Sequence, residues 1–245
     1  FYQAECLSLA GDLAAAVSVY DRIVKQHAQA PQTVDAYYGL GIAYAELAQH
    51  ENAAKTFDEF VKKFPKDERL DECRLRNGAA LTGLERHADA EKLYQQVQSV
   101  ATSPYAEYAL YQLALCVQVQ DKLPQAADLF ESLPKRFPKG SYFGPALLSA
   151  GKCRFRAEQF PQAAADFTQV IARKDAGADE AAWLLGRSLI RQANPAGAVK
   201  VLDQGIAANP QSKFLPDMRF SRLEGLASQP ESRKTAPTQF VEFAL

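Results

Sequence analysis

Residues 37–65, YYGLGIAYAELAQHENAAKTFDEFVKKFP, hold one complete copy of the pattern that decides the fold. Its anchor is Ala53, and an alanine recurs throughout the chain at gaps of 35 to 37 residues. The six anchors are Ala16, Ala53, Ala90, Ala126, Ala163 and Ala198. A period of about 20–50 residues is typical of stacked repeat units rather than of one globular core. The spacing therefore predicts a repeat architecture.

Two further positions keep a fixed distance from each anchor. Four residues after it stands a large apolar side chain, at Tyr20, Phe57, Tyr94, Phe130, Phe167 and Leu202. Twelve residues before it stands a small residue, at Ala4, Gly41, Gly78, Ala114, Gly151 and Gly186. Residues four apart share one face of an α-helix. The pattern predicts a first helix, helix A, whose small residue accommodates the large side chain of a second helix, helix B.

Turns and helix ends fit the same register. Three residues before each anchor we expect the turn between helices A and B, as in Gly11-Asp12-Leu13, and Pro124 and Pro161 suit the first position of helix B. Pro65, Pro138 and Pro210, twelve residues after their anchors, are expected to end helix B. No stretch alternates with period two. The predicted fold is all-α, a solenoid of about six antiparallel helix pairs.

These residues resemble the tetratricopeptide repeat (TPR). The segment from Tyr37 to Tyr44, with Ala53, Phe57 and Pro65, looks like a complete copy, and weaker copies run from about Phe1 to Pro210. The spacing exceeds the family's usual period of about 34 residues. The resemblance implies a right-handed α-solenoid without catalytic activity that binds protein segments in a concave groove lined by helix A. The extended spacing and the recurring Phe-Pro-Lys helix ends also resemble TPR proteins of the bacterial cell envelope.

Some repeats depart from the pattern, and the chain ends differ from its middle. Asn77 replaces an apolar residue, and Arg154 falls where Tyr44 and Leu81 stand in other repeats. A capping helix is expected at about 213–227, using Phe214, Leu215, Met218, Phe220 and Leu223, so residues 1–227 are predicted to form the solenoid. Residues 228–245 read as a Ser/Pro-rich linker or the start of a following element, with an apolar end, Phe240–Leu245, that could dock on the last repeat. Because the pattern is already under way at Phe1, we expect a piece of a longer protein.

Composition narrows the class of partner. The chain has 47% apolar and 23% charged residues and a formal charge of -1, which argues against nucleic acid as the main ligand. No apolar run approaches the roughly 20 residues needed to cross a bilayer. We therefore expect a protein or peptide partner, no membrane span and no cofactor.

The residues that could carry chemistry fit structural roles better. Cys6, Cys116 and Cys153 all lie ten residues before an anchor, which indicates a packing position, whereas Cys73, near a helix start, is expected to be more reactive. His50 and His87 occupy the turn position, and His27 lies near a helix end. The acidic run, at Asp67, Glu68, Asp71 and Glu72, is expected to be a solvated helix start. No catalytic residues and no metal ligands are predicted.

The candidate site is the concave wall formed by helix A. Aromatic and basic side chains gather there at Tyr38, Tyr111, Lys152, Phe155, Arg156, Trp183, Arg187 and Arg191. Rings beside guanidinium groups could hold a peptide with apolar and acidic side chains. The alternative is that Trp183 and Phe155 pack between helices while the cations pair with nearby acids. The lysine and asparagine clamp of chaperone-binding TPR domains is missing, because its positions hold pairs such as Tyr38 and Ile42.

These observations favour a non-enzymatic scaffold that binds a protein segment in the groove. The alternative is a structural spacer, or a segment that recruits substrate within a larger multidomain protein. The second resemblance suggests the periplasm or cell envelope, with the cytoplasm as the alternative, since four apparently unpaired cysteines favour a reducing compartment.

Overall fold

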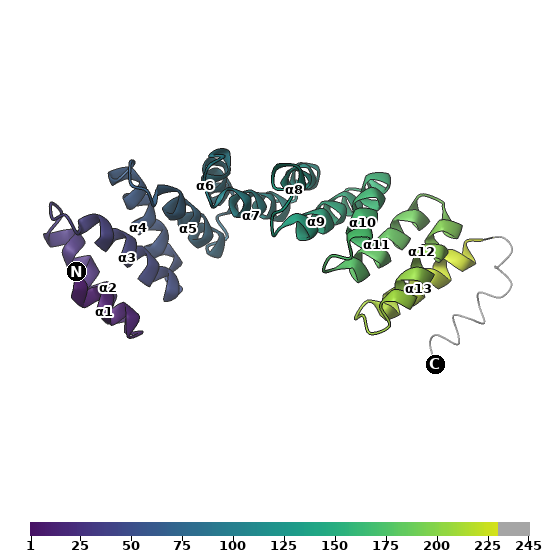
Figure 1. The fold of residues 1–245 in the computed structure, drawn as a ribbon, viewed down its shortest axis with the longest axis horizontal. Coiled ribbons are helices and arrows are strands. Elements are labelled where there is room, and N and C mark those ends of the chain that lie inside the picture. The colour runs from purple at the N-terminus through teal and green to yellow at the C-terminus, as the bar shows by residue number, and fades with distance from the viewer. Residues whose placement is uncertain (230–245) are drawn as a thin grey trace. The chain divides into compact units, whose positions relative to one another are not determined.

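The computed structural model describes residues 1–229, in which every regular element is an α-helix (Figure 1). The chain divides into two compact units, Phe1–Gln120 and Asp121–Leu245. The first unit holds α1 (Tyr2–Leu9), α2 (Leu13–Gln26), α3 (Thr33–Glu46), α4 (His50–Lys63), α5 (Leu70–Gly83), α6 (His87–Ser99) and α7 (Ala106–Val119). The second holds α8 (Leu123–Arg136), α9 (Phe143–Arg156), α10 (Phe160–Arg173), α11 (Ala178–Arg191), α12 (Pro195–Ala208) and α13 (Leu215–Ala227).

Within each unit the helices pack in chain order. Each helix contacts the next one, and in the second unit α11 also contacts α9 and α13. Odd-numbered helices correspond to helix A of the predicted repeats and even-numbered helices to helix B. Each unit is thus a stack of antiparallel helix pairs, which confirms the predicted all-α solenoid fold.

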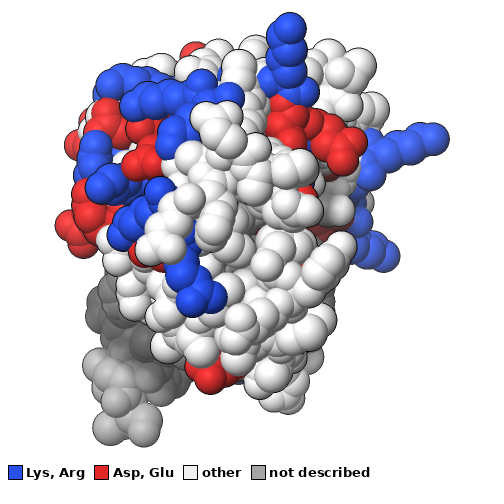
Figure 2. Space-filling view, turned by 90° about the vertical axis from the view of Figure 1, so that its left-hand side faces the viewer, with Lys and Arg blue, Asp and Glu red and all other residues white. Residues whose placement is uncertain are grey.

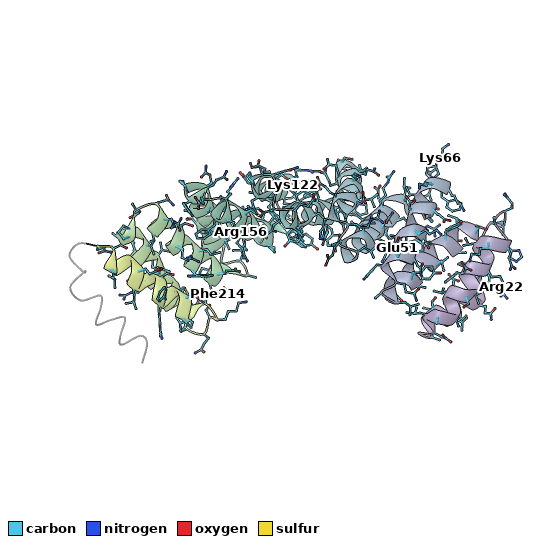
Figure 3. The ribbon with its side chains drawn as sticks, turned by 180° about the vertical axis from the view of Figure 1, so that it is seen from behind. Arg22, Glu51, Lys66, Lys122, Arg156 and Phe214 are labelled. Atoms are coloured by element: carbon cyan, nitrogen blue, oxygen red, sulfur yellow. The ribbon has the colours of Figure 1, made fainter. Side chains whose placement is uncertain are left out.

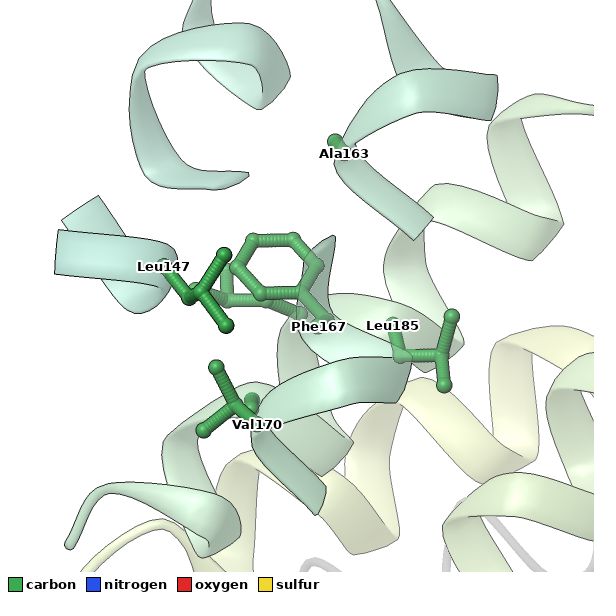
Figure 4. Close-up of a cluster of buried hydrophobic side chains, with 7 residues drawn as sticks. Leu147, Ala163, Phe167, Val170 and Leu185 are labelled. Carbon is green, nitrogen blue, oxygen red and sulfur yellow. The ribbon is translucent and has the colours of Figure 1, made fainter. Parts of the chain in front are cut away.

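The predicted interlock of small and large residues forms the core. All six anchor alanines are fully buried, and so are their large partners four residues on, Tyr20 being the most exposed at 4%. A Cβ added to Gly41 would lie 2.6 Å from the ring of Phe57, and one added to Gly151 would lie 2.6 Å from the ring of Phe167. Figure 4 shows Phe167 and Ala163 in the buried cluster of the fifth repeat. These glycines let helix A approach the large side chain of helix B.

The turn between helices A and B has the same backbone in every repeat. The residue five before each anchor has a positive φ, at Gly11, Ala48, Glu85, Asp121, Glu158 and Ala193. This residue closes helix A in the left-handed region, which glycine adopts most readily. The position three before the anchor, predicted to lie in the turn, is instead the first residue of helix B, so Pro124 and Pro161 occupy its second position. Pro fits there too, because the first-turn N–H groups have no partner within the helix.

The prolines predicted to end helix B do so. Phe64, Phe137 and Asn209 are the C-terminal cap residues of α4, α8 and α12, and each directly precedes a proline. The steric restriction on the residue before a proline removes it from the helical region.

Three predictions about single residues are wrong. Cys73 is fully buried, and burial raises the pKa of its thiol to about 12, so it is shielded rather than reactive. Cys6, predicted to pack like Cys116 and Cys153, is exposed, because it lies on the first described helix, whereas Cys116 packs against Thr82 of the preceding helix pair. Phe220, predicted to cover the last repeat, is 45% exposed, because it lies two residues from the buried Met218 and so points away from it. Of the predicted linker, residues 228–245, the structure describes only Ser228 and Gln229, and the apolar end Phe240–Leu245 lies outside the described residues.

Candidate binding surface on helix A

The basic and aromatic residues predicted in the last repeats lie on two neighbouring helices of the second unit. Lys152, Phe155 and Arg156 come from α9, and Trp183, Arg187 and Arg191 come from α11. Lys152 and Arg156 are four residues apart, and so are Trp183, Arg187 and Arg191 in turn, which places each series along one helix face. Because α9 and α11 pack together, the two series meet. We call these six residues the basic–aromatic cluster.

Arg187 is the centre of this cluster. Its guanidinium carbon lies 5.3 Å from the centroid of the Phe155 ring and 5.4 Å from that of Trp183. Both distances are within the range of cation–π attraction. Within residues 1–229, Arg187 has no carboxylate oxygen within 4.0 Å, and its side chain is half-buried. The charge of Arg187 is therefore held between two rings without an internal counter-ion.

The other three cations of the cluster each have an acidic partner. Lys152 pairs with Glu180 at 2.7 Å, and Arg156 pairs with Asp121 at 2.9 Å. Arg191 lies 3.9 Å from Glu158 and over the ring of Phe160 at 5.1 Å. Figure 3 labels Arg156 at the end of α9, where it is exposed. The sequence left open whether the cations face a ligand or pair with nearby acids. Lys152, Arg156 and Arg191 pair with acids.

The two rings are also fixed by the core. Trp183 stacks on Phe214 with centroids 5.5 Å apart and an interplanar angle of 19°, and its Nε1 donates to Ser221 Oγ at 3.2 Å. Phe155 meets Phe160 edge to face at 5.5 Å and packs on the cluster of the fifth repeat. Both rings remain half-buried. These contacts hold both rings in fixed orientations.

Tyr38 and Tyr111 belong to the first unit and occupy a different environment. Tyr38, on α3, donates its hydroxyl to Glu72 Oε1 at 2.9 Å, while Arg69 lies over its ring at 5.1 Å. Glu72 also accepts from Tyr105 at 3.1 Å and pairs with Arg76 at 2.7 Å. Burial raises the pKa of the Tyr38 hydroxyl, and the hydrogen bond to Glu72 adds to the shift. Tyr111 is a half-buried residue of α7.

The acidic run at the start of α5 does more than face solvent. Asp67 and Asp35 both pair with Arg69, at 2.9 and 2.8 Å, which ties the start of α5 to α3. The hydrogen bonds from Arg69 lower the pKa of Asp67. Asp71 pairs with Arg74 at 3.2 Å. The only sequence signals for this network were the spacings of Glu72 to Arg76 and of Asp71 to Arg74, which suit helical ion pairs.

Arg154, the basic residue at an otherwise apolar position, joins three helices of the second unit. Its guanidinium donates to both oxygens of Asp166 on α10 at 2.8 Å and also to Glu131 on α8. Asp166 is 2% exposed, and burial raises the pKa of its carboxyl to about 6 although Arg154 opposes the shift. Arg154, which stands where other repeats have an apolar residue, is therefore neutralised by the buried carboxylate of Asp166.

The described residues contain no group of three or more histidine, cysteine, aspartate or glutamate side chains arranged to hold a metal ion. His50, predicted to be a turn residue, is instead the first residue of α4, and its ring lies 3.0 Å from where a Cβ of Gly83 would lie. All four thiols are free. No helix among residues 1–229 is both long and apolar enough to span a bilayer.

Comparison with known proteins identifies the family. A tetratricopeptide repeat profile matches residues 4–68 and 148–213, and a second such profile matches residues 108–140. The chain is a tetratricopeptide repeat protein. The repeats therefore make it a helical scaffold of the kind that mediates protein interactions, in a family that is typically non-catalytic. No curated protein matches this TPR chain in sequence.

Solved structures share the fold of this TPR protein at low sequence identity. The C-terminal part of a TPR repeat-containing protein from Cytophaga hutchinsonii has a TM-score of 0.70 at 16% identity, covering 99% of this chain and 95% of its own. A tetratricopeptide repeat protein from Parabacteroides merdae has a TM-score of 0.60 at 13% identity, covering 99% and 90%. PilW, a type IV pilus biogenesis factor, has a TM-score of 0.55 at 19% identity, covering 87% and 94%.

Proposed function

We propose that this TPR protein binds a peptide or protein segment on its helix A surface, with the basic–aromatic cluster as the main contact and without catalysing a reaction. The observation that supports this most is Arg187, which lies between Phe155 and Trp183 and has no carboxylate partner within residues 1–229. A guanidinium group can donate two parallel hydrogen bonds to one carboxylate. The ligand is therefore a segment with an acidic side chain or terminus next to an apolar one.

The other predicted site residues contribute to binding in three different ways in this proposal. Phe155 and Trp183 act as anchors, because rigid rings lose little conformational entropy on binding. Lys152, Arg156 and Arg191 orient the ligand at longer range, since their charges are already offset by acids. Tyr38 and Tyr111 provide a separate contact region on the first unit.

The test is a selection from a random peptide library displayed on phage, using the 245-residue chain as bait. Enriched peptides should share an acidic residue beside an apolar one. Arg187→Gln should weaken their binding at least about tenfold, the size expected for a lost charge-assisted hydrogen bond of about 1.5–3 kcal/mol. Arg191→Gln is the matched control, on the same helix face but already near Glu158, and should change affinity less than about threefold.

Two results would contradict the proposal. A library that yields no enriched peptide would favour the spacer role, and equal losses in the two variants would remove Arg187 from the centre of the site. Helicity measured by circular dichroism must match the unmodified chain, so that a lost interaction is not confused with unfolding.

The proposed compartment is the periplasm or cell envelope. This assignment rests on the extended repeat spacing and the Phe-Pro-Lys helix ends, which resemble those of TPR proteins of the bacterial cell envelope. The test is fractionation of cells that express the tagged full-length gene product. Recovery with cytoplasmic marker proteins would contradict the assignment.

A further inference from the structure

The first repeat carries the same pair of residue types as the sixth, with the charge reversed. In the sixth repeat Trp183 stands fifteen residues before the anchor and Arg187 stands eleven before it. In the first repeat these positions hold Phe1 and Glu5. Residues four apart stand on the same side of a helix. Helix A therefore presents an aromatic–acidic pair in the first unit and an aromatic–basic pair in the second.

Glu5 lines a groove of about 440 Å³ in the first unit. The groove lies between α1 and α3, both at the purple end of Figure 1, and Tyr20 from α2 is part of its wall. Its size is within the range of about 300–1,000 Å³ that is typical of binding pockets. The groove is accessible from solvent, because Glu5, Tyr38 and Ile42 in its wall are only half-buried and Glu46 is exposed. We call this space the α1–α3 groove.

Aromatic and aliphatic side chains form one part of the groove wall. Tyr20 is 4% exposed, and the end of its ring reaches α3, where a Cβ on Gly39 would lie 2.6 Å away. Phe1 packs beside Tyr20 with the ring centroids 6.1 Å apart. Leu13 and Ile42 add aliphatic surface to the wall. Such a wall can hold the methylene groups of a long side chain whose charged end stays near water.

The charged groups of the α1–α3 groove are mostly acidic. They are the carboxylates of Glu5, Asp35 and Glu46 and one cation, Arg69. Arg69 pairs with Asp35 at 2.8 Å, and eleven residues of α3, about 16 Å of helix, separate Asp35 from Glu46. Among residues 1–229, Glu5 and Glu46 have no cationic nitrogen within 4.0 Å, the amino group of the chain included. Two acids of the groove therefore have no internal counter-ion.

These features suit an organic cation better than a metal ion. A calcium ion takes about six to eight oxygen ligands, whereas the described residues hold no group of three or more possible metal ligands. The apolar part of the wall would also gain nothing from a bare ion. A lysine or arginine side chain matches both parts, because it joins a cation to a chain of methylene groups.

We propose that the α1–α3 groove binds a lysine or arginine side chain of a partner protein, with the cation beside Glu5 and Glu46 and the methylene groups on the apolar wall. A hydrogen bond between a cation and a carboxylate is roughly twice as strong as one between neutral groups. The ring of Tyr20 also attracts a cation at short range. This site goes beyond the contact proposed around Arg187 and does not depend on it.

The test is a selection from a random peptide library displayed on phage, with the Arg187→Gln variant of the full chain as bait. This change removes the central cation of the other site, so the outcome does not depend on the function proposed above. An N-terminal tag places Phe1 in a peptide bond, so that no ammonium group there opposes a cationic ligand. A salt concentration of about 0.15 M screens long-range attraction. The enriched peptides should share a lysine or arginine beside an apolar residue.

A pair of matched double variants then locates the binding site. Glu5→Gln with Glu46→Gln should weaken binding of the enriched peptides at least about tenfold, because charge-assisted hydrogen bonds are lost. The control is Glu51→Gln with Glu68→Gln, which removes the same charge from the same unit. Glu51 and Glu68 are exposed, have no cation within 4.0 Å among residues 1–229 and lie outside the groove. This control should change affinity less than about threefold.

A selection that enriches no peptide, or only peptides without a basic residue, would overturn the proposal. So would equal losses in the two double variants, because the attraction would then come from the overall charge of the unit. Circular dichroism of both double variants must match the bait, so that a lost interaction is not confused with unfolding. The selection with the unmodified chain tests the site at Arg187 separately, so failure here leaves that site unaffected.

Discussion

Ala193 has a backbone conformation that alanine tolerates poorly. Its φ is 56°, in the left-handed region, and the matching residue of the first repeat is Gly11 with a φ of 81°. A left-handed conformation costs a non-glycine residue about 1–2 kcal/mol, whereas glycine loses about 0.5–1 kcal/mol more entropy on folding. Ala193→Gly should therefore stabilise the protein by about 0.5–1 kcal/mol, measured by urea unfolding.

The reverse change provides the control. Gly11→Ala should destabilise by about 1 kcal/mol, and the cause would be backbone strain alone, because an added Cβ meets no atom within 4 Å. A stability gain from Gly11→Ala would show that the turn conformation does not limit stability.

Thiol reactivity should separate the four cysteines. Cys6 is exposed, while Cys73, Cys116 and Cys153 are buried, and burial raises the pKa of Cys153 to about 11. At pH 8 one thiol per chain should react quickly with a thiol reagent such as Ellman's reagent, and three should react only at the rate of local unfolding. Cys6→Ser should remove the fast phase, and a fast phase that survives this change would contradict the burial of the other three.

At the scale of helices, Gly151 shows how a repeat interlocks. A Cβ there would lie 2.6 Å from the ring of Phe167 on the facing helix, so Gly151→Ala should cost about 1–3 kcal/mol through overpacking, although alanine favours helix. In a Phe167→Leu background the same change should cost less than half as much, because the ring is absent. A double-mutant cycle by denaturant unfolding measures this coupling, and additive effects would place the contact elsewhere.

Arg154 joins α8, α9 and α10, and its removal should be costly and depend on pH. Arg154→Leu leaves Asp166 as a buried carboxylate without its main partner, so we expect a loss of about 3–5 kcal/mol at pH 7. A carboxyl group whose folded pKa is raised stabilises the fold fully below its ordinary pKa and loses that contribution as pH rises through about 6. Without Arg154 the pKa of Asp166 would rise further.

The cost of Arg154→Leu should therefore shrink between pH 7 and pH 5, where Asp166 takes up a proton. Urea unfolding at the two pH values measures this difference. Adding Asp166→Asn to Arg154→Leu should recover stability at pH 7 and flatten the pH dependence, and an equal cost at both pH values would contradict the buried-anion explanation.

The repeat register could be predicted from sequence because it depends on contacts within one helix pair. Ala163 and Phe167 share a helix face, and Gly151 stands at a fixed distance from both, so the pattern defines the interlock. Contacts between repeats could not be predicted in the same way. Such contacts depend on which side chain the neighbouring helix places opposite a given residue, and the repeat period does not specify that side chain. Examples are the burial of Cys73, the pairing of Arg69 with Asp35 and the partners of Arg154.

At the scale of the whole molecule, the N-terminal end differs from the interior of the stack. Figure 2 looks onto the end that carries α1, where uncharged residues cover the central and lower part of the view. On α1, Tyr2 and Leu9 are 76% and 90% exposed. Stacked repeats normally cover such a face with a neighbouring repeat or a polar capping helix. Replacing Tyr2 and Leu9 with glutamate should therefore lower concentration-dependent light scattering while leaving the unfolding free energy within about 0.5 kcal/mol.

A stack of repeats should also confine the effects of a mutation. Each helix contacts mainly its neighbours in the chain, so stability is close to a sum of repeat and interface terms. In α8, α9 and α10, Arg154→Leu should lower the free energy of amide opening by as much as it lowers the free energy of unfolding. In α2, α3 and α4 the exchange rates should change less than about threefold. Native-state hydrogen exchange of the full chain, read helix by helix, makes this comparison. A uniform loss over all helices would mean that the chain unfolds as one cooperative unit, because local openings would then cost as much as global unfolding. That outcome would rule out the additive description despite the repetitive sequence.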